Sequence, residues 1–304
     1  MTSAPATEAA DARYQGFDTW RDDAILAALL EGQQRALNSV AAAIPALSQA
    51  ARAAAERLAG GGRLIYIAAG SPALMSLADA LEIPQTYGVA YDRIVLVLAD
   101  GEGIAKRLNG MREDDAEGAR ADMAAVGVGP GDCVIATSAS GSTPYTVAGM
   151  MAAREAGAVT IGIAGNAGAK LLEAADIGVL LDAGPEVISG STRMGAGTAQ
   201  KAALNMLSTL MGVHLGHVYD GLMVNVKADN EKLRGRAARI VTKITGVDTA
   251  AAVRALELSG GEVKPAVLIA AGVTTPAEAG LLLGQTKGNL RMALAKIGAT
   301  TPAI

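Results

Sequence analysis

The sequence predicts an α/β fold, a doubly wound sheet of five parallel strands followed by a small C-terminal helical module. Five apolar runs of strand length recur between residues 63 and 182, and helical patterns separate them. The apolar runs are continuous rather than alternating, which is typical of parallel strands that helices cover on both faces. We therefore expect a larger domain at residues 18–240 and the small helical module at residues 241–304.

Each element follows from its local pattern. A helical pattern covers residues 22–58, and Pro45 should interrupt it because proline lacks the N–H that a helix interior needs. After the sheet, a long apolar helix is expected at 196–216 and a charged amphipathic helix at 225–246. Three short helical patterns broken by glycines make up the rest of the module. The predicted strands are RLIYIA (63–68), RIVLVLA (93–99), DCVIAT (132–137), AVTIGIA (158–164) and IGVLLD (177–182).

The composition excludes several classes of protein. A net charge of −4 over 304 residues, with one Trp and one Phe, provides neither the basic surface nor the stacking side chains of a nucleic-acid binder. No apolar run reaches the length of a membrane span, and the N-terminus does not resemble a secretory signal. Cys133, the single cysteine, can form no internal disulfide and should be buried. We expect a soluble, cytoplasmic protein.

Two polar loops stand where a strand is followed by a helix, AAGSPA (68–73) and TSASGSTP (137–144). In an open parallel sheet, ligands bind beyond the carboxyl ends of the strands, where free N–H groups at helix N-termini favour an anion. Hydroxyls suit a phosphate monoester because they donate hydrogen bonds without adding charge. The alternative is that Ser71 and Thr143 only cap their helices ahead of a proline. The candidate phosphate-binding residues are Gly70, Ser71, Ser138, Ser140, Gly141, Ser142 and Thr143.

A third polar stretch, ISGSTRMGAGTAQK (188–201), adds Ser191 and two cations, Arg193 and Lys201. These cations could bind a phosphate or a carboxylate, and the alternative is a glycine-rich helix start with solvated charges. His214 and His217 lie three residues apart with no cysteine nearby, so we expect a packing or capping role and no metal site.

SASGSTPY, STRMGAGTAQK and several further motifs together resemble one bacterial family, the N-acetylmuramic acid 6-phosphate etherases. That family belongs to the sugar isomerase (SIS) domain superfamily, of which the vertebrate glucokinase regulatory protein is a distant member. The similarity runs from about residue 18 to 298 and is most specific in STRMGAGTAQK and LNMLST. The other matching segments are GGGRLIYIAAG, LEIPQTYG, SASGSTPY, GPEVISGS and GLMVNVKADNEKL.

The resemblance implies a fold, a reaction and two acid–base residues. It implies a SIS domain followed by a UBA-like module, in a homodimer whose sites lie near the interface. The implied enzyme is a lyase of cell-wall (peptidoglycan) recycling that cleaves the D-lactyl ether of N-acetylmuramic acid 6-phosphate by elimination and rehydration. Such chemistry needs no cofactor or metal, but it needs two positioned acid–base groups. The matching motifs place Glu82 as the acid that protonates departing lactate and Glu113 as the base at C2.

The chain departs from the family pattern around the implied site. The common GTSGR is GSPAL, with Pro72, Ala73 and Leu74 in place of Ser, Gly and Arg, while SGRTP has Ser142 in place of Arg. Where the family has RMKAGTA, this chain has RMGAGTA, with Gly195 in place of Lys. Where the family has LMVD, this chain has LMVN, with Asn225 in place of Asp. Two other functions therefore stay open. One is a SIS enzyme for another sugar phosphate, and the other is a non-catalytic sugar-phosphate sensor.

Overall fold

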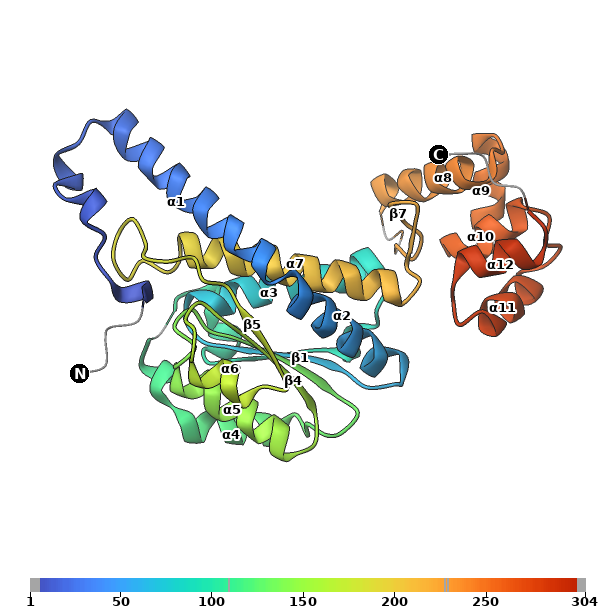
Figure 1. Cartoon of the computed structure of the whole chain (residues 1–304). Coiled ribbons are helices and arrows are strands. Elements are labelled where there is room, and N and C mark those ends of the chain that lie inside the picture. Colours follow the sequence, from blue (N-terminus) through green and yellow to red (C-terminus); the bar gives the residue numbers. More distant parts are fainter. Residues whose placement is uncertain (1–5, 109, 227, 229, 300–304) are drawn as a thin grey trace. The chain divides into compact units, whose positions relative to one another are not determined.

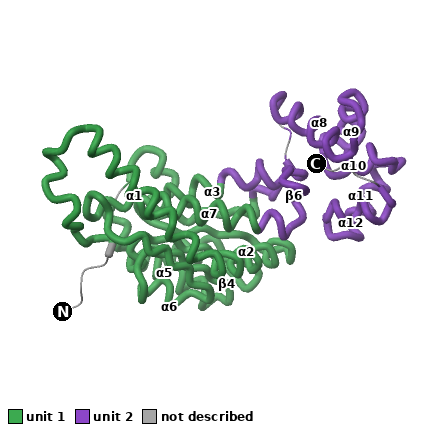
Figure 2. The backbone as a smooth tube through the Cα atoms, turned by 45° about the horizontal axis from the view of Figure 1, so that its top comes forward, with its two compact units in different colours: residues 1–80, 92–210 green, residues 81–91, 211–304 purple. Residues whose placement is uncertain are grey.

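The computed structural model describes residues 6–108, 110–226, 228 and 230–299. The chain divides into two compact units (Figure 2). Unit 1 comprises residues 1–80 and 92–210, and unit 2 comprises residues 81–91 and 211–304. The predicted domain boundary at 240 falls inside a helix of unit 2, and the predicted domain extents remain a prediction.

Unit 1 is built on the predicted five-stranded sheet, in the order β2-β1-β3-β4-β5 with every pair parallel. All five strands were predicted correctly to within one or two residues at their ends. Every residue of β1 and β3 is buried, which explains their unbroken apolar sequence. The strands are β1 (Leu64–Ala68), β2 (Ile94–Leu98), β3 (Cys133–Thr137), β4 (Val159–Ala164) and β5 (Ile177–Leu180).

Helices cover both faces of this sheet (Figure 1). On one face, α4, α5 and α6 pack on the apolar side chains of β1, β3 and β4. On the other face, α2 packs on the sheet. The predicted interruption at Pro45 is confirmed, because this proline lies in the first turn of α2. The helices of unit 1 and those that begin in it are α1 (Asp22–Ala42), α2 (Ile44–Ala59), α3 (Ser71–Tyr87), α4 (Ala116–Ala125), α5 (Pro144–Glu155), α6 (Lys170–Ala174) and α7 (Gly195–His214).

Short 3-10 helices connect several of these elements. They are η1 (Ala6–Glu8), η2 (Ala12–Tyr14), η3 (Phe17–Thr19), η4 (Tyr91–Arg93), η5 (Gly101–Ala105) and η6 (Gly110–Asp114). From its sequence, Glu113 is predicted to open the helix after the second strand, and this prediction is wrong, because Glu113 lies in η6. That helix, α4, begins at Ala116, since the Asp115 side chain accepts a hydrogen bond from the Gly118 N–H.

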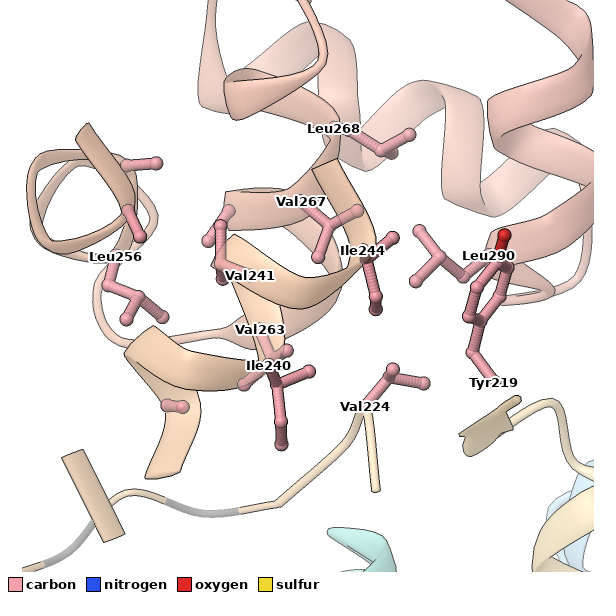
Figure 3. Close-up of a cluster of buried hydrophobic side chains, with 14 of the residues drawn as sticks. Tyr219, Val224, Ile240, Val241, Ile244, Leu256, Val263, Val267, Leu268 and Leu290 are labelled. Atoms are coloured by element: carbon pink, nitrogen blue, oxygen red, sulfur yellow. The ribbon is translucent and has the colours of Figure 1, made fainter. Parts of the chain in front are cut away.

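Unit 2 is a helical bundle with a small antiparallel hairpin, and its core is apolar (Figure 3). Ile240, Val241 and Ile244 of α8 pack with Val267 and Leu290 in this core. The elements are β6 (Val218–Tyr219), β7 (Leu222–Met223), α8 (Glu231–Thr245), α9 (Thr249–Leu258), α10 (Val263–Ala270), α11 (Pro276–Gln285) and α12 (Leu290–Lys296).

Two expectations for this unit were wrong. The amphipathic helix does not begin at residue 225, because Asn230 caps α8 by accepting a hydrogen bond from the Leu233 N–H. The third helical pattern of the module splits into α11 and α12, because Lys287 and Gly288 adopt left-handed φ angles of 50° and 73°.

Candidate functional site

The two hydroxyl loops follow neighbouring strands at the carboxyl edge of the unit 1 sheet. β1 and β3 pair in parallel, and Ala68, the last residue of β1, lies opposite Thr137, the last residue of β3. From β1 the chain adds β2 on one side of the sheet, and from β3 it adds β4 and β5 on the other side. The point between β1 and β3 is therefore a topological switch point. Such a switch point is where open α/β sheets bind ligands. The topology therefore places both predicted loops at the preferred ligand position of this fold.

In the loop after β3, the hydroxyl groups bind one another and the backbone. The Ser138 and Thr143 hydroxyls lie 2.8 Å apart, and Ser138 Oγ accepts a hydrogen bond from the Gly141 N–H at 3.0 Å. The Ser140 hydroxyl accepts hydrogen bonds from both the N–H and the hydroxyl of Ser142, at 3.2 and 3.0 Å. Gly141 has a φ of 74°, and a Cβ there would lie 2.5 Å from the Ala169 Cβ. The loop thus has a fixed, tight conformation that only glycine permits at this position.

The capping alternative is wrong for Thr143. Thr143 occupies the N-cap position of α5, but its side chain makes no capping hydrogen bond and pairs with Ser138 instead. Pro144, at the start of α5, has no N–H, so the first N–H groups of the helix belong to Tyr145 and Thr146. The Thr143 side chain therefore does not cap the N-terminal end of α5, which carries a partial positive charge next to the buried Tyr145 and Thr146.

The loop after β1 lies against Glu113. Gly70 is buried with a φ of 63°, and a Cβ at this position would lie 2.8 Å from Glu113 Oε1. Ser71 begins α3, and its hydroxyl lies 3.5 Å from the Thr192 hydroxyl. The structure thus brings together the loop after β1, the carboxylate of η6 and the polar stretch at 188–194.

The surroundings of Glu113 favour the neutral form of its carboxyl group. Partial burial raises the pKa of Glu113, and the neighbouring carboxylates of Asp114 and Asp100 raise it further. A carboxylate with a raised pKa is a stronger base at the pH where it is ionised. Glu82, the other predicted acid–base residue, is exposed on the part of α3 that belongs to unit 2. Its pairing with Glu113 therefore remains a prediction.

The third polar stretch is organised by a residue that sequence reasoning missed. Both oxygens of the buried Glu186 carboxylate accept hydrogen bonds from the start of α7, from the N–H groups of Gly195 at 2.9 Å and Ala196 at 2.8 Å. This N-terminus is therefore already occupied by a protein carboxylate. Glu186 lies nine residues before the helix, outside the positions where capping motifs are found, so no local pattern indicates it.

The predicted polar residues of this stretch are solvent-accessible. Arg193 is exposed, Ser191 and Thr192 are half-buried, and Lys201 is exposed on α7 with its ammonium group bonded to Asn205. An anion here would meet side chains rather than the helix N-terminus. Gly195, where the family pattern has lysine, is tightly packed, because a Cβ would lie 2.9 Å from Glu186 Oε2 and 3.1 Å from the Ala36 Cβ.

A second unpredicted feature is the buried carboxylate of Asp79 on α3. It accepts hydrogen bonds from the Tyr66 hydroxyl at 2.7 Å, the Asn205 amide at 2.6 Å and the Ser208 hydroxyl at 2.8 Å. Burial and the adjacent Asp79 carboxylate raise the pKa of Tyr66 well above its ordinary value. This network joins β1, α3 and α7, and it fixes the helix that begins at the first loop.

The remaining expectations concern histidines, metals and membranes. Among the described residues, no group of His, Cys, Asp and Glu side chains could hold a metal ion. His214 is exposed, whereas His217 has a buried Nδ1 without a partner among the described residues. Cys133 is buried, as predicted. In the part of the chain that the structure describes, no helix combines the length and apolarity needed to cross a membrane.

Comparison with known proteins shows which domain the larger unit contains and to which family the chain belongs. The SIS domain family matches residues 114–210, the region that carries the hydroxyl loop, so the larger unit contains a SIS domain. The chain is 44% identical over 270 residues to the N-acetylmuramic acid 6-phosphate etherase of Deinococcus radiodurans, covering 88% of each chain. It is 46% identical over 231 residues to the etherase of Symbiobacterium thermophilum, covering 76% of this chain and 77% of the relative. The chain belongs to the N-acetylmuramic acid 6-phosphate etherase family.

A third relative and one solved structure complete the comparison. The etherase of Streptomyces avermitilis is 42% identical over 271 residues, which is 89% of this chain and 87% of the relative. Among solved structures, a phosphoheptose isomerase from Francisella tularensis matches with a TM-score of 0.47 and 16% identity, over 63% of this chain and 97% of that chain.

Proposed function

We propose that this protein cleaves the D-lactyl ether of N-acetylmuramic acid 6-phosphate to give N-acetylglucosamine 6-phosphate and D-lactate. The observation that carries the proposal is the 44% identity to the Deinococcus radiodurans etherase over 88% of both chains. The accessible hydroxyls of the loop before α5 support it, because hydroxyls beside the start of a helix suit the phosphate group of a sugar phosphate. We further propose that the reaction is that of a carbon–oxygen lyase.

The proposed reaction proceeds by elimination and rehydration. In the open-chain sugar, the C1 aldehyde acidifies the C2 proton, and the Glu113 carboxylate removes it. The electron pair of the broken C2–H bond forms the C2–C3 double bond as the C3–O bond breaks, and Glu82 protonates the departing lactate oxygen. Water then adds to C3, and a proton returns to C2. The raised pKa of Glu113 supports its role as the base.

The sugar phosphate would bind with its phosphate group at the loop after β3. The hydroxyls of Ser140, Ser142 and Thr143 would contact the phosphate oxygens beside the partial positive charge at the start of α5. Binding there would bring the sugar near Gly70 and Glu113, because the loop after β1 follows the neighbouring strand. Ser191, Arg193 and Lys201 are proposed to contact the rest of the substrate.

A second candidate function has one specific observation in its favour. Ser142 is exposed and neutral, and Leu74 is an exposed apolar side chain, where the family pattern has arginine at both positions. Each missing charge-assisted hydrogen bond would weaken binding by about 1.5–3 kcal/mol. These changes favour a sugar phosphate with fewer negative charges than the muramic acid ester, which could be turned over or only sensed.

We also propose that the chain forms a homodimer. The side chains of Leu26, Leu30 and Leu37 on α1 are 66%, 59% and 48% exposed, and their spacing places them along one face of the helix. An exposed apolar stripe of this kind marks a protein–protein interface. A cytoplasmic location remains a prediction.

The test of the proposed function is release of D-lactate from N-acetylmuramic acid 6-phosphate by the purified protein. Glu82→Gln and Glu113→Gln should abolish release, whereas Glu117→Gln, a change at an exposed glutamate of α4, should leave it intact. If the sugar phosphate raises the melting temperature but no lactate is released, the protein is a sensor. If it does neither, the substrate is a different sugar phosphate.

A further inference from the structure

Unit 2 contains a cavity of about 430 Å³ at the N-terminal end of α10. Its lining includes Gly88, Asn225, Glu262, Lys264 and Gly288, all of them residues of this unit. None of the residues proposed to bind or transform the sugar phosphate lines it. The volume falls within the range of sites for small ligands.

Lys264 gives this cavity its chemical character. The side chain is buried, with 6% of its surface exposed, and its ammonium group donates one hydrogen bond, to the Gly288 carbonyl at 2.9 Å. Among the described residues, no carboxylate forms an ion pair with it. Buried lysines are almost always paired, because an ammonium group removed from water needs compensation. Within the part of the chain that the structure describes, the buried ammonium group of Lys264 therefore has no ion-pair partner.

The backbone adds to the positive potential. α10 begins beside Lys264, and the side chain of its N-cap residue, Glu262, makes no capping hydrogen bond. Glu262 also lines the cavity, but it is exposed, so solvent screens its carboxylate. The N–H groups of Val263 and Lys264 carry the partial positive charge of the helix start, and Pro265 has no N–H.

Two titratable groups respond to this environment. Burial lowers the pKa of Lys264 from 10.5 to about 8, so the amine is still mainly charged at neutral pH. Burial, and then the charge of Lys264, lower the pKa of His217 to about 4, so the imidazole is neutral there. At neutral pH the imidazole of His217 therefore adds no positive charge to that of Lys264.

We propose that this cavity is a binding site for a small oxyanion, a phosphate or carboxylate group that pairs with the ammonium group of Lys264 at the start of α10. The inference does not depend on the etherase activity. The competing explanation is that Lys264 only ties α10 to the loop at Gly288, and in that case added oxyanions would not affect the lysine.

The experiment follows the amine of Lys264 directly in the full-length protein. Lysine labelled with ¹³C at Cε gives one NMR signal per residue, and the Lys264 signal is identified as one that titrates near pH 8 and disappears in Lys264→Arg. The signal is then titrated with pH in sodium phosphate, in sodium acetate and in sodium chloride of matched ionic strength. Lys243→Met, which removes an exposed lysine of α8, is the matched control.

We expect a saturable shift of the Lys264 signal and a rise of its pKa by about 1 to 3 units, because an opposite charge nearby favours the ammonium form. A response to phosphate without one to acetate identifies a phosphate group as the ligand, and a response to both identifies the wider oxyanion class. The response should persist in Ser140→Ala/Ser142→Ala, which separates this cavity from the proposed substrate site. A Lys264 signal that behaves the same in phosphate, acetate and chloride would overturn the proposal, whatever the etherase assay shows.

Discussion

The Cα atom of Gly70 faces the carboxylate of Glu113 so closely that a Cβ would lie 2.8 Å from Oε1 and 3.1 Å from Oε2. Glycine is also required there by a φ of 63°. Gly70 lies in the loop after β1 and Glu113 in η6, 43 positions away in the sequence. Their contact fixes the position of the proposed base relative to the end of β1.

Gly70→Ala should therefore impair both folding and turnover. The left-handed backbone costs an L-residue about 1–2 kcal/mol, and the new methyl group must displace Glu113. We expect a lower free energy of unfolding in urea and a fall in kcat that is larger than the change in KM. Gly103→Ala is the control, because nothing lies within 4 Å of a Cβ at that exposed position. Equal activity of the two variants would contradict the placement of Glu113 at the reacting carbon.

The acid side of the pH–rate profile should report the pKa of Glu113. Because burial and then Asp114 and Asp100 raise this pKa above its ordinary 4.5, kcat/KM should rise with pH through a midpoint above 4.5. Asp114→Asn removes one of the neighbouring charges and should move the midpoint to lower pH. Glu117→Gln, which changes an exposed acid on α4, should leave it in place. An unmoved midpoint in Asp114→Asn would mean that another group limits the rate.

The same pKa shift has a consequence for stability. A carboxyl whose pKa is raised in the folded state contributes stability that is present below the unfolded value of 4.5 and is lost as pH rises through the folded value. Glu113→Gln should thus be more stable than the parent at neutral pH, and this advantage should shrink toward pH 4. Urea unfolding at several pH values measures the difference. An advantage that does not vary with pH would show that the glutamine acts by packing.

Glu186 should be a main determinant of the stability of α7. Glu186→Ala removes the acceptor of two N–H groups at the helix start and should lower the free energy of unfolding by about 1–2 kcal/mol or more. Glu186→Gln keeps one carbonyl acceptor, so its free energy of unfolding should lie between those of the parent and the alanine variant. Asp182→Asn, at an exposed position shortly before, serves as the control in the same urea unfolding experiment. If the alanine variant were as stable as the parent, the cap would contribute nothing.

Ser142→Arg should strengthen substrate binding. Ser142 is exposed on the hydroxyl loop, so an arginine fits without displacing the core, and it restores the residue common in the family. One charge-assisted hydrogen bond is worth about 1.5 kcal/mol or more, which corresponds to about a tenfold lower KM for N-acetylmuramic acid 6-phosphate. Ala124→Arg, on the exposed face of α4, controls for net charge. An unchanged KM would favour a substrate whose phosphate is not near this loop.

The sequence by itself determined the sheet of unit 1 and the position of the hydroxyl loop. Continuous apolar runs predicted all five strands because a strand buried on both faces tolerates few polar residues. The loop after β3 was identifiable because its hydroxyls, its glycine and its proline stand within eight residues. Helix ends that depend on one capping residue, such as Asn230 before α8, were predicted less accurately. A helical pattern in the sequence can continue past the residue at which a specific contact begins or ends the helix.

Only the tertiary structure decided which distant residues meet. Glu113 lies against Gly70, Glu186 caps α7, and Asp79 joins Tyr66 to α7, although no local pattern indicates any of these contacts. Likewise, no local sequence pattern indicates that Lys264 is buried and lines a cavity. Local sequence encodes hydrophobic periodicity and capping over a few residues, whereas contacts between polar groups far apart in the chain depend on how the packed elements bring them together.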